Sequence, residues 1–347
     1  MARQTPSQTE KIFAAAFAAM LAIISADAPA HADDYPVRPV RIIVPTGPGG
    51  GYDVMARIAA DQLGTRLGQS VFVENRTGAG TIVGTQAAIA AAPDGYTLLA
   101  GGLSNIVFNA GLYRTAPYDA LTQLVPVAIF YRLSYILVGS NTLPLASVKD
   151  IIAAAKAKPG SINLATAGVG TGQQLTAVAF MKATDTKFIE VPYKGATAVY
   201  PDLIAGRVDL FFDSTAGAFP FVQSGKVKGF AILAPQRSKD MPDIPTMDEA
   251  GVNGLNVDSW IGLFAPAGTP KTVIDKLQSG IAASSSELKA KYVAGGADYM
   301  WVPPEKLDGF VHAEHDSGRS SSKTPELLWS KQRINPATAI NERRGLR

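Results

Sequence analysis

The chain has 347 residues, of which 47% are apolar and 18% charged, with 33 glycines, 23 prolines, three histidines and no cysteine. This length predicts two domains, and the apolar fraction suffices for ordinary hydrophobic cores, which excludes global disorder. The lack of cysteine excludes disulfides, thiolate zinc sites and cysteine nucleophiles. The net charge of +3 is too balanced to favour nucleic acid as a partner.

The three histidines stand at the ends of the chain. His31 falls in a segment that we expect to be removed, and His312 and His315 are close to the C-terminus. A Ser–His–Asp triad or a histidine metal centre in the middle of the chain is therefore excluded. His312 and His315 are spaced to share a helix face, with only Glu314 or Asp316 as further ligands, so we expect no metal site and no cofactor.

The N-terminus predicts an export signal. Two basic residues precede the thirteen-residue apolar run Ile12–Ile24, and Ala30-His31-Ala32 is a typical cleavage site. The alternative, a transmembrane anchor, needs about 20 apolar residues. No later stretch is long enough to span a bilayer. We therefore expect residues 1–32 to be a signal peptide and the mature protein to begin at Asp33 in the periplasm.

Beyond residue 37, short apolar runs alternate with longer helical patterns, which is typical of a parallel α/β sheet. The predicted strands span residues 40–45, 70–75, 96–102, 131–140, 161–168, 188–195, 207–213, 228–235 and 257–270. The predicted helices span residues 51–68, 81–92, 148–160, with Ser147 as N-cap, and 174–183. No fixed-period repeat is present.

This order of elements predicts two α/β lobes with a cleft between them. We expect residues 33–135 plus 256–315 to form the first lobe and residues 136–255 the second. In such sheets, ligands lie beyond the carboxyl ends of the strands, where helix N-termini converge. Trp260 and Phe264 are expected in the core.

The first glycine-rich loop runs from Pro45 to Asp53, directly after a predicted strand, and opens a predicted helix. Glycine lets a ligand approach the backbone closely, and the free N–H groups and dipole of a helix start attract anions. Three consecutive glycines exceed the need of a tight turn. The alternative is such a turn, with Asp53 in the first turn of the helix.

The second loop, Arg76 to Gly80, leads into a helix that contains Gly84. Its glycine spacing is close to a dinucleotide fingerprint, but the acidic residue expected about 20 positions later is missing, because Asp94 lies in a Pro-Asp-Gly turn. Close packing of a helix against the sheet is therefore favoured over a cofactor.

The third loop, Ala167 to Gln174, repeats the pattern of the first in the second lobe, where Thr171 offers a hydroxyl and Gln174 an amide. None of the three loops ends like a P-loop, which excludes nucleotide hydrolysis. Two facing anion sites favour a ligand with a carboxylate at each end.

Two carboxylates near these loops would repel an anion. Asp53 and Asp213 are therefore expected either to orient waters or backbone amides, or to accept from a ligand hydroxyl or ammonium. The structural alternatives are a helix-terminus charge for Asp53 and a strand-end cap for Asp213.

Several segments between about residues 35 and 310 resemble the periplasmic receptors of tripartite tricarboxylate transporters, the Bug family. They are YPVRPVRIIVPTGPGGGYDVMAR, VENRTGAGTIVGT, APDGYTLLAGG, VPYKGATAVYPDLIAGRVDLFFD, MPDIPTMDEAG and SWIGLFAPAGTP. The resemblance implies a type II periplasmic binding-protein fold, two Rossmann-like lobes joined by a hinge. It also implies that a carboxylate is bound between the lobes and delivered to a membrane permease.

The resemblance also implies site residues. Thr46 stands where the family usually has Phe, and Gln174 where it often has His, which leaves a neutral hydrogen-bonding end. The predicted ligand-binding residues are Thr46, Gly47, Gly49, Gly50, Gly51, Asp53, Ser104, Asn105, Ala167, Gly168, Gly170, Thr171, Gln174, Asp213 and Ser214.

The C-terminus departs from the family. Residues 316–347 are polar and lack helical periodicity, whereas the family ends in a helix. Asp316 to Leu327 can be encoded by DNA that, read two bases later, gives the family-like FGPLVIKNAGI. We therefore interpret residues 316–347 as an atypical tail, either frameshifted or disordered.

The leading hypothesis is a monomeric periplasmic receptor, not an enzyme, that captures a small carboxylate, with a dicarboxylate favoured, by lobe closure. One alternative is a sensor that reports the ligand to a membrane signalling protein. The other, a secreted hydrolase or isomerase, is disfavoured because no Cys or central His is present and no acid–base pair beyond Asp53 and Asp213 is evident.

Overall fold

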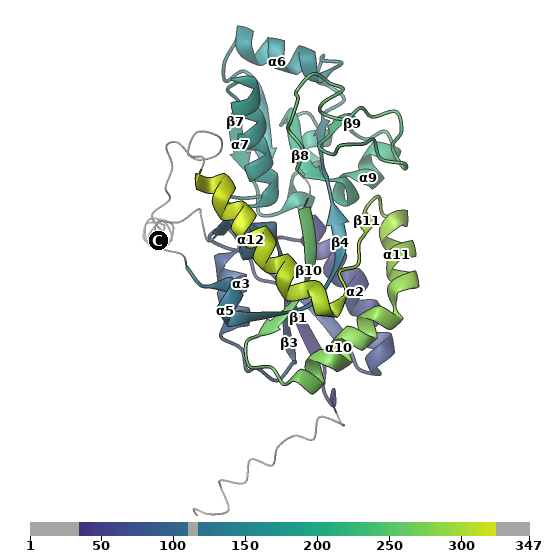
Figure 1. Cartoon of the computed structure of the whole chain (residues 1–347). Coiled ribbons are helices and arrows are strands. Elements are labelled where there is room, and N and C mark those ends of the chain that lie inside the picture. Colours follow the sequence, from purple (N-terminus) through teal and green to yellow (C-terminus); the bar gives the residue numbers. More distant parts are fainter. Residues whose placement is uncertain (1–34, 110–116, 258, 324–347) are drawn as a thin grey trace, which may run out of the picture. The chain divides into compact units, whose positions relative to one another are not determined.

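The computed structural model describes residues 35–109, 117–257 and 259–323, and side chains among them as far as Asp316 (Figure 1). From Arg38 onward these residues form one unit built on two β-sheets with helices packed against them. Within these ranges, no helix combines the length and hydropathy that crossing a bilayer requires.

The first sheet has six strands in the order β11-β4-β10-β3-β1-β2. Its strands are β1 (Val40–Val44), β2 (Val71–Asn75), β3 (Thr97–Gly102), β4 (Leu124–Leu133), β10 (Ser259–Pro266) and β11 (Asp298–Tyr299). Strand β1 pairs parallel with β2 and β3, whereas β10 pairs antiparallel with both β3 and β4. A strand from late in the chain thus lies in the middle of this sheet.

The second sheet has five strands in the order β7-β6-β8-β5-β9. Its strands are β5 (Tyr135–Gly139), β6 (Asn163–Thr166), β7 (Ile189–Pro192), β8 (Leu210–Ser214) and β9 (Lys228–Ile232). Strand β6 is parallel to β7 and β8, and β5 is antiparallel to β8 and β9. The expectation of parallel sheets was wrong in this respect, because β10 and β11 run in the reverse direction in the first sheet and β5 does so in the second.

Helices α2, α3, α5, α10, α11 and α12 accompany the first sheet, and α6, α7, α8 and α9 the second (Figure 1). The first group spans α2 (Gly51–Leu67), α3 (Ile82–Ile89), α5 (Ala120–Gln123), α10 (Lys271–Ala283), α11 (Ser285–Ala294) and α12 (Leu307–Lys323), with a π-helical segment η2 (Leu103–Phe108) and a 3₁₀ turn η4 (Pro304–Lys306). The second group spans α6 (Val148–Ala157), α7 (Gly172–Thr184), α8 (Tyr200–Ile204) and α9 (Thr215–Gln223), with a 3₁₀ turn η3 (Ala196–Ala198). Ser147 caps α6 as predicted, since its hydroxyl accepts from the Asp150 amide.

The segment predicted as one strand, residues 131–140, is two strands in two different sheets. The break is at Ser134, whose carbonyl accepts from the Thr215 amide instead of continuing the ladder. Apart from the exposed Arg132, both halves are apolar and buried, so their pattern does not mark Ser134 as a break. The chain crosses from the first sheet to the second at this residue.

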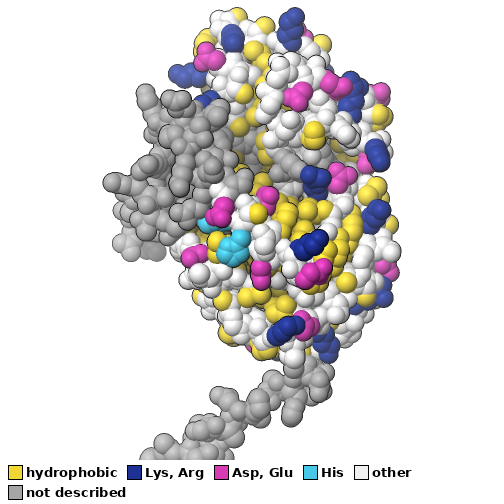
Figure 2. All heavy atoms as spheres, in the orientation of Figure 1, with side chains coloured by type: hydrophobic (Ala, Val, Ile, Leu, Met, Phe, Trp, Pro, Cys, Tyr) yellow, Lys and Arg dark blue, Asp and Glu magenta, His cyan; other side chains and the backbone are white. Residues whose placement is uncertain are grey.

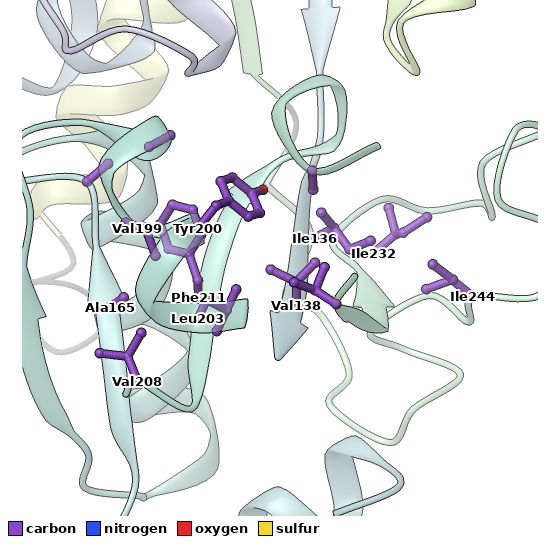
Figure 3. Packing of buried hydrophobic residues seen from close by; sticks show 14 of the residues in the cluster. Ile136, Val138, Ala165, Val199, Tyr200, Leu203, Val208, Phe211, Ile232 and Ile244 are labelled. Carbon is purple, nitrogen blue, oxygen red and sulfur yellow. The ribbon is translucent and has the colours of Figure 1, made fainter. Parts of the chain in front are cut away.

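Each sheet has its own hydrophobic core. In the first, Trp260 and Phe264 are buried as predicted, and the Trp260 indole donates to Glu314 of α12 at 2.9 Å. In the second, Tyr200 packs edge-on against Phe211, while Ile136 and Ile232 cluster on another part of the sheet (Figure 3).

The C-terminal helix α12 packs against β4 and η2 and continues to Lys323. Its backbone therefore continues past residue 316, and the interpretation of residues 316–347 as an atypical tail stays a prediction. Residues 324–347, like the expected signal peptide, lie outside the described residues. His315 is buried while His312 is exposed, and no three His, Asp or Glu side chains gather as metal ligands in the described ranges.

Candidate functional site

A small cavity lies beyond the carboxyl ends of β1, β6 and β8, where loops from both sheets meet. Its volume is about 10 Å³, which is room for one water molecule. Its walls are Thr46, Gly47, Gly50, Gly51, Tyr52, Leu133, Tyr135, Ala167, Thr171, Gly172, Gln173, Gly195, Ala196 and Ser214.

The first wall is the start of α2. Gly50 is the N-cap and offers no side chain, and the amides of Gly51 and Tyr52 donate to no described residue. Thr46, Gly47, Gly50 and Gly51 all line the cavity, as the sequence predicts for this loop. The positive end of a 17-residue helix therefore opens onto the cavity.

Asp53 lies behind this wall and does not line the cavity. Its buried carboxylate accepts from the Gly49 amide at 3.1 Å, from Arg57 through two bonds of 2.9 Å, and from Asn75 at 2.9 Å. Asn75 also donates to the Thr46 carbonyl. Of the roles considered for Asp53, the geometry matches the one that orients a backbone amide, and Gly49 belongs to the same support.

The second wall is the start of α7. The Thr171 hydroxyl accepts from the Gln174 amide, which caps the helix, and Thr171 lines the cavity. The side chain of Gln174 turns away, because its oxygen accepts from the Gly170 amide at 2.7 Å and its nitrogen donates to Glu190 at 3.2 Å. The neighbouring Gln173, absent from the predicted set, takes its place in the wall.

The third wall is the start of α9, where Ser214 is the N-cap and lines the cavity. Asp213 lies beneath it, fully buried. The Tyr200 hydroxyl donates to it at 2.7 Å and the Ser214 amide at 2.8 Å, with a longer bond of 3.3 Å from Gln173. Burial raises the pKa of Asp213 to about 6, although these hydrogen bonds act to lower it.

Ser104 and Asn105 follow β3, as predicted, but their contact with the site is a hydrogen bond between each of them and the Tyr52 hydroxyl. The Tyr52 hydroxyl accepts from the Ser104 amide and donates to the Asn105 side chain, both at 3.3 Å. The Asn105 oxygen also accepts from the Gly102 amide at 2.9 Å. Neither residue lines the cavity, whereas Tyr52 does. Both residues therefore support a wall and do not form one.

Other wall residues were missed by sequence reasoning. Leu133 and Tyr135 flank the crossing between the sheets, and burial raises the pKa of the Tyr135 phenol, which therefore stays protonated. Gly172 contacts this phenol so closely that a Cβ would overlap it. Gly195 stands in the VPYKG segment that carries the resemblance, which is the one signal that pointed to it.

The loops of the two sheets touch around the cavity. A Cβ at Gly47 would lie 2.5 Å from the Lys194 carbonyl, and a Cβ at Gly170 would lie 2.6 Å from the Gly80 Cα. Glycine is therefore required on both sides for this approach. Gly84 serves packing within the first sheet unit, since its Cβ would meet the Arg76 carbonyl at 2.6 Å, which favours the packing interpretation of the second loop.

The cavity wall contains no Lys, Arg or His. On the face shown in Figure 2, cationic side chains are interspersed with acidic ones. Three helix N-termini thus supply the positive potential that a buried anion would meet. Such a wall offers backbone amides and hydroxyls, which are donors that carboxylate oxygens accept from.

The comparisons with known proteins now bear on this geometry. Residues 55–295 match the model of the tripartite tricarboxylate transporter family receptor. The chain belongs to this receptor family. Protein BugT of Bordetella pertussis is 36% identical over 290 residues, which cover 83% of this chain and 89% of BugT. The predicted resemblance is therefore confirmed.

Solved structures confirm the two-lobed periplasmic binding-protein fold. The receptor has a TM-score of 0.79 and 32% identity to the periplasmic binding protein BugD, over 85% of this chain and 99% of BugD. It has a TM-score of 0.79 and 30% identity to R. palustris Rpa4515 with adipate, over 85% and 99% of the two chains. For MatC from Rhodopseudomonas palustris with bound malate, the TM-score is 0.77 and the identity 29%, over 83% of this chain and 100% of MatC.

Proposed function

We propose that this receptor captures a small dicarboxylate in the cavity between its two lobes and delivers it to a tripartite tricarboxylate-type membrane transporter. The observation that carries the proposal is the convergence of the N-termini of α2, α7 and α9 on one cavity whose wall has no cationic side chain. The start of α2 belongs to the first lobe, and the starts of α7 and α9 belong to the second. Each end of a dicarboxylate therefore meets a helix N-terminus of a different lobe.

The ligands of related structures support the same class. Rpa4515 was solved with adipate and MatC with malate, which are both dicarboxylates. The cavity of about 10 Å³ is far smaller than either molecule. The loops that meet around it must therefore separate before a ligand enters, which is the hinge motion of a two-lobed receptor.

The proposal includes the route and the organisation of the chain. Residues 1–32 direct export to the periplasm, residues 33–135 with 256–315 form the first lobe, and residues 136–255 form the second. The receptor acts as a monomer without turnover. Binding without chemistry is supported by Asp213, the buried carboxylate next to Ser214 of the wall, which is already engaged by Tyr200 and Ser214.

Native mass spectrometry of the purified protein, followed by thermal shifts with a panel of carboxylates, tests this proposal. We expect a co-purified or added dicarboxylate to raise the melting temperature, because it binds only the folded state. Conversion of a carboxylate to product, with no stabilising carboxylate found, would replace the receptor by an enzyme. Loss of dicarboxylate uptake on deletion of the gene tests the delivery step.

A further inference from the structure

The hydroxyl of Thr46 is buried in the cavity wall without a hydrogen-bond partner among the described residues. The backbone at this residue is held in place, because the Asn75 side chain donates to the Thr46 carbonyl at 3.1 Å. The position of the hydroxyl is therefore set by the support behind the loop. A buried polar group without a partner costs free energy, so it calls for an explanation.

Three other polar side chains of the wall, those of Tyr52, Ser214 and Gln173, already have partners. The Tyr52 hydroxyl bonds Ser104 and Asn105, and the Ser214 hydroxyl accepts from the Gly217 amide at 3.1 Å. The Gln173 amide donates to Asp213. No hydrogen bond within the described residues engages the hydroxyl of Thr46 or that of Tyr135. Of the two, Thr46 stands in the loop that opens α2.

A threonine hydroxyl differs in chemistry from the backbone amides beside it. The amides of Gly51 and Tyr52 only donate, which suits carboxylate oxygens. A hydroxyl both donates and accepts, which suits a ligand group that does the same, an alcohol. Thr46 and the start of α2 belong to one loop and line one cavity, so that alcohol would lie next to the carboxylate bound at α2.

We propose that Thr46 is a specificity-determining residue that selects dicarboxylates carrying a hydroxyl group beside one carboxylate. This inference rests on the proposed function and narrows its ligand class. The hydroxyl of the ligand and that of Thr46 satisfy each other, whereas an unsubstituted dicarboxylate leaves Thr46 unpaired. A site built to bond a ligand hydroxyl discriminates against the analogue that lacks it.

Isothermal titration of matched pairs tests the proposal on the full mature chain. The pairs are malate with succinate, 2-hydroxyglutarate with glutarate, and 2-hydroxyadipate with adipate. In the pair whose length the cavity accepts, we expect the hydroxylated member to bind about tenfold more tightly, the effect of one additional hydrogen bond. Equal affinity within every pair that binds would overturn the inference and leave the proposed function intact.

Variants locate the discrimination at this residue. Thr46→Val keeps the shape and removes the hydroxyl, so the preference should fall to about one while the unsubstituted ligand keeps its affinity within about twofold. Thr46→Ser retains the hydroxyl and should retain the preference. If Thr46→Val lowers the affinity for the hydroxylated and the unsubstituted dicarboxylate equally, Thr46 only positions the ligand in general, and the inference is overturned. If no dicarboxylate binds the wild-type chain, the proposed function itself fails.

Discussion

The Thr197 hydroxyl of the second lobe donates a hydrogen bond of 2.8 Å to the carbonyl oxygen of Pro48 in the first lobe. The Thr197 amide points at the same oxygen, at 3.4 Å. Pro48 lies within the loop that opens α2, next to Gly47, which packs against Gly195. These contacts lie beside the cavity of about 10 Å³, and the proposed function requires that they break before a dicarboxylate enters.

Thr197→Val should accelerate ligand association. The change removes a hydrogen bond that holds the loops together, so a larger fraction of molecules is open to ligand, by about two- to tenfold. Stopped-flow fluorescence with the stabilising carboxylate measures the association rate constant. Thr65→Val is the matched control, because it removes a threonine-to-carbonyl bond on the exposed face of α2. An association rate equal to that of the control would contradict the prediction.

Gly170→Ala should leave the two lobes farther apart. Gly170 has a φ of +76°, and its added Cβ would lie 2.6 Å from the Gly80 Cα. This contact is with backbone, which moves less readily than the end of a flexible side chain. Gly225→Ala is a strict control, since Gly225 has a φ of +66° and open space around it. We expect a similar loss of melting temperature in both variants, from backbone strain, but a larger radius of gyration by small-angle scattering only for Gly170→Ala. Equal radii would exclude the Gly80 contact as a limit on closure.

Asp213 should make stability fall as the pH rises from about 4 to above 6. Its pKa is raised by burial from 3.8 to about 6 in the folded protein, so the folded state binds the proton more tightly than the unfolded state. The stabilising effect is complete below the unfolded pKa and is lost as the pH rises through the folded pKa, by about 3 kcal/mol in total. Urea unfolding from pH 4 to 8 measures the trend.

Asp213→Asn isolates this contribution from other titrating groups. Its amide keeps partners in Tyr200 and Ser214 but does not ionise. The difference in unfolding free energy between wild type and variant should therefore change across this pH window, in favour of the variant at higher pH. A difference that stays constant from pH 4 to 8 would show that Asp213 does not titrate there.

Arg57→Met should destabilise the fold and weaken ligand binding together. Arg57 makes two bonds to the buried Asp53, and without them this carboxylate keeps only Asn75 and the Gly49 amide as partners. We expect a loss of about 1–3 kcal/mol in unfolding free energy and a several-fold lower affinity, because Asp53 holds the glycine loop. Lys271→Met breaks an exposed pair of the same i,i+4 spacing with Asp275 and should cost about 0.5 kcal/mol or less. Chemical denaturation and titration calorimetry measure both, and unchanged affinity would remove Asp53 from the support of the site.

The sequence predicts the loops of the site better than the side chains within them. Gly47, Gly50 and Gly51 line the cavity because a helix that starts after a strand must open there. Whether Gln173 or Gln174 faces inward depends on the rotation of α7 about its axis. That rotation is set by packing against other elements, which one-dimensional spacing does not contain.

The wall residues Leu133 and Tyr135, where the chain crosses between the lobes, could not be predicted from local sequence pattern either. Leu133 and Tyr135 sit in what looks like one continuous apolar strand, yet the chain changes sheets at Ser134. Gly195 has a role at the cavity only because Gly47, distant in sequence, comes against it. Long-range contacts of this kind follow from the tertiary fold and not from local pattern.

The place of β10 in the first sheet also dictates an order of events during synthesis. All strands of the second sheet lie between Tyr135 and Ile232, so that sheet is complete when the chain has grown past β9. The first sheet keeps a gap between β3 and β4 until Ser259–Pro266 has been made. A nascent chain therefore carries an unfinished N-terminal lobe for most of its length. A truncation before Ser259 removes β10 and β11, so one edge of β3 and both edges of β4 are left open to pairing with other chains.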